Sequence, residues 1–189
     1  MDSSKKTCMR WLALATVIMA CSACGPEGRE IGSTAPSGGL TGQTIQQLAA
    51  DSLKQPIRFS SEPLPPFVKR TYGIGQAETM GRWTTGKLAV IELTGALPRS
   101  FDIELVAGAY GPNVGAKARL IIGAVVREFV VTGDIGAARS YTVSFDGVSA
   151  ESMIFIEVPE PISPAALGKS DDSRKLGLAL VAMAITPRQ

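Results

Sequence analysis

The chain lacks histidine altogether, and its three cysteines, Cys8, Cys21 and Cys24, all lie near the start of its 189 residues. Nucleophilic systems of the Ser-His-Asp and Cys-His kinds need an imidazole base, so they are excluded. Zinc sites built from His and Cys are excluded beyond Cys24, where neither ligand occurs. We therefore expect no metal site and no other cofactor, and the chemistry left to the chain is that of carboxylates.

Most glycosidases use a pair of carboxyl groups that flank the glycosidic bond to be hydrolysed. Spacing along the chain does not give the separation of such a pair in space, and no pair stands out. We therefore expect a protein that is not an enzyme. The carboxylates considered are Glu78, Glu92, Asp102, Glu104, Glu128, Asp134 and Asp146.

Long apolar runs are also scarce. The run at residues 11–20 follows three cations and is too short to span a bilayer as a helix. Small residues lead from it to Cys21 and again to Cys24, as at the lipidation sites of bacterial lipoproteins. Residues 1–24 are therefore predicted to be a lipoprotein signal, with either cysteine lipidated. The alternatives are an ordinary cleaved signal peptide or an uncleaved anchor.

This signal predicts a protein anchored by lipid in the bacterial cell envelope, at the outer membrane and facing the periplasm or the outside. Without the signal the chain has no excess of charge. The full sequence has 19 Lys and Arg against 17 Asp and Glu, and the part from Cys21 onward has 16 of each. No basic patch remains to neutralise phosphates, so nucleic acid is not expected as a partner.

Three segments follow the signal. Residues 25–42 are rich in Gly, Ser, Thr and Pro, which is typical of a flexible tether. Residues 43–55 are predicted to be a short amphipathic helix, because Thr44 and Gln47 match a capping box and Pro56 ends the apolar periodicity. Residues 56–189 form the predicted domain.

This domain is predicted to be all-β. Alternating or continuous apolar residues, separated by turn residues, occur at 88–93, 101–110, 119–122, 125–132, 141–145, 153–158 and 176–185. Gly123 and Ala124 predict a hairpin between the third and fourth of these. Seven such strands without helical periods between them indicate an antiparallel β-sandwich, jelly-roll-like, with one short N-terminal helix.

Two polar segments interrupt this pattern. In residues 73–86, Trp83 offers an apolar face for a sugar ring, Arg82 a planar fork of donors and Glu78 an acceptor. The alternative is that Trp83 caps the core while Arg82 and Glu78 pair with each other.

In residues 161–177, Asp171 and Arg174 are placed to bond each other or the backbone of a crossover loop. Asp171 and Asp172 also offer oxygen ligands to calcium, but no regular series of carboxylates surrounds them. At the end of the strand before residue 111, Tyr110 and Asn113 either belong to a ligand rim or form a tight turn.

The chain of motifs over residues 56–186 resembles a C-terminal β-sandwich domain that is appended to bacterial membrane proteins of the phosphoglycerol transferase type and to other cell-envelope glycan proteins. The motifs are Pro65-Pro66-Phe67-Val68, Gly73-Ile74, Glu78, Gly81-Arg82-Trp83-Thr84, Ala109-Tyr110-Gly111-Pro112-Asn113, Pro161-Ile162-Ser163-Pro164, Leu167-Gly168, Asp172, Arg174 and Leu176-Gly177-Leu178. The resemblance implies the fold and a glycan-rich setting. It implies no catalytic residues.

Here the domain stands behind a lipoprotein signal without a transferase portion. We therefore expect a non-catalytic module that binds an envelope polysaccharide or oligosaccharide. The alternative is a protein-interaction or scaffolding module of envelope glycan assembly, with an envelope protein as its partner. The predicted ligand-binding residues are Glu78, Arg82, Trp83, Tyr110, Asn113, Asp172 and Arg174.

Overall fold

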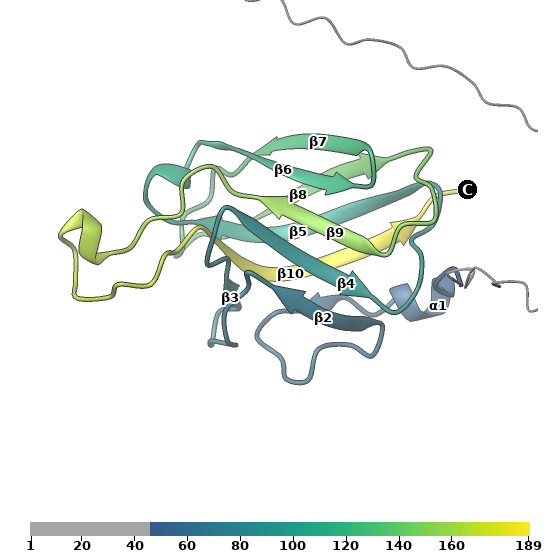
Figure 1. The fold of residues 1–189 in the computed structure, drawn as a ribbon, viewed down its shortest axis with the longest axis horizontal. Coiled ribbons are helices and arrows are strands. Elements are labelled where there is room, and N and C mark those ends of the chain that lie inside the picture. The colour runs from purple at the N-terminus through teal and green to yellow at the C-terminus, as the bar shows by residue number, and fades with distance from the viewer. Residues whose placement is uncertain (1–45) are drawn as a thin grey trace, which may run out of the picture. The chain divides into compact units, whose positions relative to one another are not determined.

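A computed structural model describes residues 46–189, which form two antiparallel sheets packed face to face (Figure 1). The first sheet has the order β1-β10-β5-β8, with β3 also paired to β10, and the second has the order β2-β4-β9-β6-β7. The strands of the first sheet are β1 (Ile57–Arg58), β3 (Arg82–Trp83), β5 (Phe101–Ala109), β8 (Arg139–Phe145) and β10 (Leu178–Pro187). Those of the second are β2 (Val68–Tyr72), β4 (Leu88–Leu93), β6 (Lys117–Ile122), β7 (Val125–Val130) and β9 (Met153–Glu157).

The predicted antiparallel sandwich is confirmed. Apart from the β6–β7 hairpin, every connection from β4 to β10 crosses from one sheet to the other, as in a jelly roll. The predicted hairpin turn at Gly123 and Ala124 is present, with Ile122 opposite Val125. Gly123 has φ 55°, a left-handed conformation that this two-residue turn requires and that glycine adopts without strain. The described residues also contain two short 3-10 turns, Gly111–Asn113 and Ala165–Leu167.

The core lies between the two sheets because alternate side chains of each strand face inward. In β5 the inward residues Phe101, Ile103 and Leu105 are fully buried, and they meet inward residues of β9 such as Ile154 and Ile156. Burying one such side chain stabilises the fold by about 1.5–3 kcal/mol. Every buried residue of the apolar clusters lies between positions 53 and 185, within the compact unit Thr41–Gln189. This unit therefore contains its own core.

The N-terminal helix is shorter than predicted. Helix α1 (Ala50–Leu53) begins at Ala50, and Thr44 lies outside the described residues. Gln47 is not helical: it forms a parallel bridge with Ala96, whose backbone also bonds the neighbours of Gln47 on both sides. These strand-like hydrogen bonds replace the predicted capping box. In residues 46–189 no helix has the length and apolar character needed to cross a bilayer.

Glu92 is a buried carboxylate on the outward side of β4. Lys69 Nζ donates to Glu92 Oε1 at 2.7 Å, and Arg70 Nε donates to its other oxygen. These bonds, with that from Arg70 contributing most, hold the pKa of Glu92 below its ordinary value.

Acid is therefore expected to destabilise the sandwich. A carboxyl whose pKa is lowered by folding stabilises the fold above its ordinary pKa, and this contribution is lost as the pH falls through the folded value. We expect the free energy of unfolding in urea to fall progressively as the pH is lowered below about 5. Glu92→Gln should be less stable near neutral pH and should show a shallower fall. An unchanged acid profile in this variant would contradict the assignment.

Candidate functional site

In the first polar segment, residues 73–85 fold as a hairpin with Thr79 and Met80 at its tip. Glu78 and Gly81 exchange backbone hydrogen bonds of 2.7 and 3.0 Å across the tip. The returning arm contains β3, which pairs with β10. The pairing of β3 with β10 thus holds residues 78–83 at the first sheet.

Trp83 lies on the face of this sheet that is turned away from the sandwich core. Its partner in register is Ala179, whose neighbours Leu178 and Leu180 belong to the core. Trp83 is 6% exposed and packs in a second apolar cluster with Leu176, Ala179 and Tyr110. The rings of Trp83 and Tyr110 meet edge to face, with centroids 6.1 Å apart. Trp83 therefore does not cap the main core.

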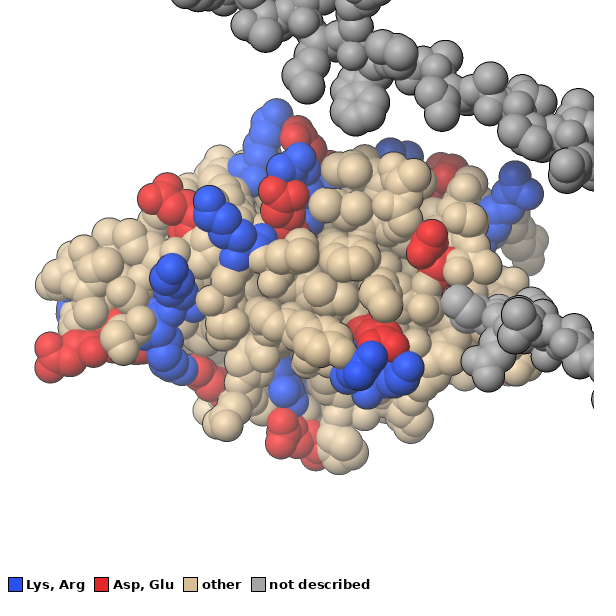
Figure 2. Space-filling view, in the orientation of Figure 1, with Lys and Arg blue, Asp and Glu red and all other residues tan. Residues whose placement is uncertain are grey.

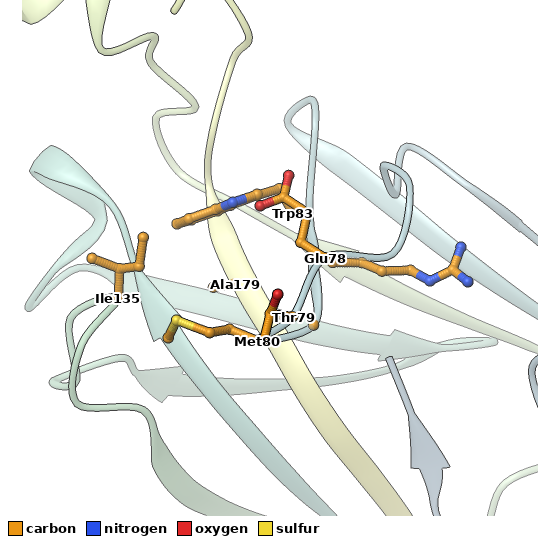
Figure 3. Close-up of a pocket in the computed structure, with 8 residues that line it drawn as sticks. Glu78, Thr79, Met80, Trp83, Ile135 and Ala179 are labelled. Atoms are coloured by element: carbon orange, nitrogen blue, oxygen red, sulfur yellow. The ribbon is translucent and has the colours of Figure 1, made fainter. Parts of the chain in front are cut away.

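A hollow of about 210 Å³ lies beside Trp83. Its lining combines Trp83 and Ala179 with two exposed apolar side chains, Met80 at 49% and Ile135 at 41% exposure. Figure 3 shows the ring of Trp83 edge-on, with Met80 and Ile135 together on one side of it. Glu78 adds a carboxylate to the same lining. The hollow thus has apolar walls with one charged acceptor among them.

Ile135 reaches the hollow from the loop between β7 and β8. Asp134 forms a bridge with Ala109 of β5, and its Oδ1 accepts a hydrogen bond of 2.9 Å from the backbone N–H of Gly136. This Asx turn holds Ile135 between two fixed neighbours. The wall of the hollow formed by Ile135 is therefore built by the fold rather than by a free loop.

Arg174 fixes Glu78 in place. Its Nη1 donates to Glu78 Oε1 at 2.7 Å, and its Nη2 donates to Asp172 Oδ2 at 2.8 Å. The hydrogen bonds from Arg174 lower the pKa of Asp172, while those to Asp172 and then to Glu78 raise the pKa of Arg174. The network ties the 161–177 loop to the hairpin. Its arginine is paired with Asp172, where the sequence suggested Asp171.

Arg82 borders the hollow, but its guanidinium is engaged elsewhere. Nε donates to the backbone oxygen of Phe59 at 3.0 Å, and Nη2 donates to the oxygens of Ser61 and Glu62 at 3.2 and 2.7 Å. The side chain is almost fully buried. The alternative pairing of Arg82 with Glu78 is therefore wrong. The guanidinium of Arg82 holds residues 59–62 in place instead of contacting a ligand.

Asn113 is likewise used within the protein. It is 1% exposed, and its Nδ2 donates to the backbone oxygens of Tyr110 and Glu160 at 2.9 and 2.8 Å. Its Oδ1 accepts from the N–H of Glu160 at 2.9 Å. The turn interpretation of this segment is the one that the structure supports, and Asn113 does not reach a ligand rim.

The structure thus divides the predicted site residues into three groups. Glu78 and Trp83 line one hollow, and Asp172 and Arg174 brace it, with Tyr110 packed behind Trp83. Arg82 and Asn113 serve the fold. Sequence reasoning missed Met80, Ile135 and Ala179, which complete the apolar wall.

No group of three or more His, Cys, Asp or Glu residues within residues 46–189 is arranged to hold a metal ion. Asp172, which the sequence offered as a calcium ligand, has both oxygens bonded to Arg174.

Residues 44–187 match the family model described as "Domain of unknown function (DUF7024)". The chain is similar to Phosphoglycerol transferase I of Escherichia fergusonii, with 31% identity over 137 residues, which are 69% of this chain and 17% of that protein. It is 30% identical, over the same shares, to Phosphoglycerol transferase I of Escherichia coli O139:H28. The chain therefore spans about a sixth of the length of these relatives. The resemblance noted in the sequence is confirmed.

The chain is also similar to solved structures, of which two are described. The CBM36-1 domain of a multidomain xylanase from the hindgut metagenome of Trinervitermes trinervoides has a TM-score of 0.45 and 14% identity, over 71% of this chain and 98% of that one. A family 29 carbohydrate-binding module has a TM-score of 0.43 and 10% identity, over 69% and 90%. At these scores neither similarity says anything about what this chain binds.

Proposed function

The chain belongs to the DUF7024 family of domains of unknown function, and from this premise we propose that its β-sandwich binds a glycan of the bacterial cell envelope. The observation that carries the proposal is the hollow beside Trp83, where an apolar wall meets a carboxylate held by Arg174. A sugar offers matching surfaces, with C–H groups on its faces and hydroxyl donors on its edges. Glu78 accepts from a hydroxyl while Trp83, Met80 and Ile135 pack against the C–H face.

The size of the hollow sets how much of the glycan enters it. Pockets that enclose a whole small ligand measure roughly 300–1,000 Å³. A space of about 210 Å³ is smaller, so it receives one sugar residue at a chain end or on a branch. The rest of the glycan then lies outside the hollow.

The proposed role is binding rather than catalysis. Glu78 is the sole carboxylate among the described residues that line the hollow, and most glycosidases need two. The relatives are named as phosphoglycerol transferases, and the matched domain is 17% of their length. We propose that in them this domain holds a glycan while the transfer reaction belongs to the remainder.

We also propose that a lipid on Cys21 or Cys24 anchors the protein at the outer membrane. Both cysteines lie outside the described residues. A tether of residues 25–42 would have a typical reach of roughly 23 Å, enough to clear a headgroup layer. Incorporation of labelled palmitate that is lost when Cys21, Cys24 or both are changed to serine would support a lipidated cysteine. Persistent labelling in that double variant would contradict it.

The binding proposal is tested with the unit Thr41–Gln189, in which Trp83 is the single tryptophan. Calorimetry and Trp83 fluorescence are followed during titration with disaccharides ending in glucose, galactose or mannose. We expect saturable binding of at least one of them and a loss of about 10-fold in affinity in Glu78→Gln, because a charge-assisted hydrogen bond is lost. Met80→Ala should also weaken binding, since it removes part of the apolar wall.

Asp51→Asn is the matched control, because Asp51 is an exposed carboxylate on α1 outside the hollow. Its affinity should equal that of the parent. Trp83→Ala is less informative, since removing a buried ring destabilises the fold, and Trp83→Phe is used instead. Absence of binding throughout the panel would move the assignment to a protein partner. Binding insensitive to Glu78→Gln and Met80→Ala would show that the sugar does not bind in the hollow.

A further inference from the structure

A row of apolar side chains crosses all five strands of the second sheet on its outer face. Register pairs Tyr72 of β2 with Val90 of β4, Val90 with Phe155 of β9, Phe155 with Ile121 of β6, and Ile121 with Val126 of β7. We refer to these five residues as the outer row. At about 4.8 Å between strands, the outer row extends over roughly 19 Å.

The outer row faces solvent. Tyr72 is 47% and Val126 is 44% exposed, and the three residues between them are half-buried. Their neighbours along the strands, such as Ile91, Ile154 and Leu120, are fully buried in the core, as the alternation of a strand requires. None of the described segments covers the row, which appears in Figure 2 within the uncharged band across the front face.

Charged residues flank the outer row on both sides, and they are paired with one another. On one side Glu92 is bonded by Lys69 and Arg70, and Arg70 also lies over the ring of Tyr72, 5.2 Å from its centroid. On the other side Arg119 pairs with Glu157, and Lys117 with Glu128 at 3.0 Å. Figure 2 shows blue and red side chains next to one another on this face of the molecule. Four cations and three carboxylates leave almost no net charge.

The apolar side chains of the outer row and the paired charges beside it favour one kind of partner over others. A stable protein interface buries about 800 Å² on each side around a core depleted of charge. Here each residue of the outer row has a charged residue two positions away on its own strand, and Leu88 and Met153 add exposed apolar side chains beside the row. An anionic polymer would need unpaired cations. A neutral sugar chain has C–H faces for Tyr72 and Phe155 and hydroxyl edges for the flanking carboxylates and guanidinium groups.

We propose that the outer row binds the extended part of a neutral glycan chain, as a second site separate from the hollow. The hollow is formed on the outer side of the first sheet, at Trp83 and Ala179, and the outer row belongs to the second sheet. The inference adds to the proposed function and rests on it in taking a glycan as the partner. A chain of several residues engages the row, while a single terminal residue fills the hollow.

The test is the dependence of affinity on chain length. The unit Thr41–Gln189 is titrated with cellobiose, cellotetraose, cellohexaose, mannobiose and mannohexaose. We expect one hexasaccharide to bind at least about 10-fold more tightly than the disaccharide of its own series, since it spans both aromatic side chains of the row. Tyr72→Ala should abolish this gain and Tyr72→Phe should retain it. Phe155→Ala should also abolish it, provided that its melting curve shows a folded protein.

Val130→Ala is the matched control, because Val130 is exposed on the same sheet but outside the row. Equal affinity for all lengths, a gain unaffected by Tyr72→Ala, or no binding of either hexasaccharide would overturn the second site. A dimer that sedimentation detects and Tyr72→Ala dissociates would also overturn it, by showing a second copy on the row.

The same titrations separate this site from the hollow. If Glu78→Gln weakens disaccharide binding while Tyr72→Ala leaves the hexasaccharide unaffected, the second site fails and the proposed function stands. If the gain depends on Tyr72 but Glu78→Gln has no effect on any sugar, the hollow is not a binding site and the outer row is supported.

Discussion

Replacing Gly81 by alanine is expected to destabilise the sandwich by more than about 3 kcal/mol and to disrupt the hollow. Gly81 has φ 140°, a backbone conformation that residues with a side chain rarely adopt. A Cβ at this position would lie 1.9 Å from the backbone oxygen of Leu180, so the hairpin would have to move away from β10. Because Met80 and Trp83 flank Gly81, the walls of the hollow would separate. Urea unfolding followed by the fluorescence of Trp83 measures both effects.

Gly86→Ala is the control for this substitution. Gly86 follows the same hairpin, but a Cβ there would meet no atom within 4 Å and its φ is not in the left-handed region. We expect its stability to stay within about 0.5 kcal/mol of the parent. If Gly81→Ala were as stable as Gly86→Ala and kept its affinity for sugars, the close contact between hairpin and β10 would not position the hollow.

The longer strands were predictable because their side chains alternate over enough residues to show a period. Strand β5 repeats an inward apolar residue at Phe101, Ile103 and Leu105, and β8 does so at Val143 and Phe145. Strands β1 and β3 have two residues each, which is too short for any period. They exist because β10 offers them backbone partners, and these partners are more than ninety residues away in sequence.

The candidate site was predictable only in part, because contacts between residues distant in sequence decide which side chains can reach a ligand. Residue type alone predicted that Trp83, Glu78 and Arg82 contact a sugar. In the fold, however, Arg82 donates a hydrogen bond to the carbonyl oxygen of Phe59. Which polar group is free depends on acceptors brought near by folding. The outer row was missed because Tyr72, Val90 and Phe155 become neighbours only through strand register. Each alone looks like an ordinary strand residue.

Asn113→Ala is expected to lower the free energy of unfolding by about 3 kcal/mol while leaving the sugar affinity of the folded protein unchanged. The alanine removes the three hydrogen bonds that the buried side chain of Asn113 makes to the backbone of Tyr110 and Glu160. Asn113→Asp should not restore stability, since it keeps the acceptor but loses both donors and buries a charge. Ser140→Ala, which removes only an exposed hydrogen bond to Glu104, should be nearly neutral. Urea unfolding gives the stabilities, and calorimetry at low temperature gives the affinities. A stable Asn113→Ala with weakened binding would return Asn113 to the ligand site, because loss of a ligand contact lowers affinity without unfolding the chain.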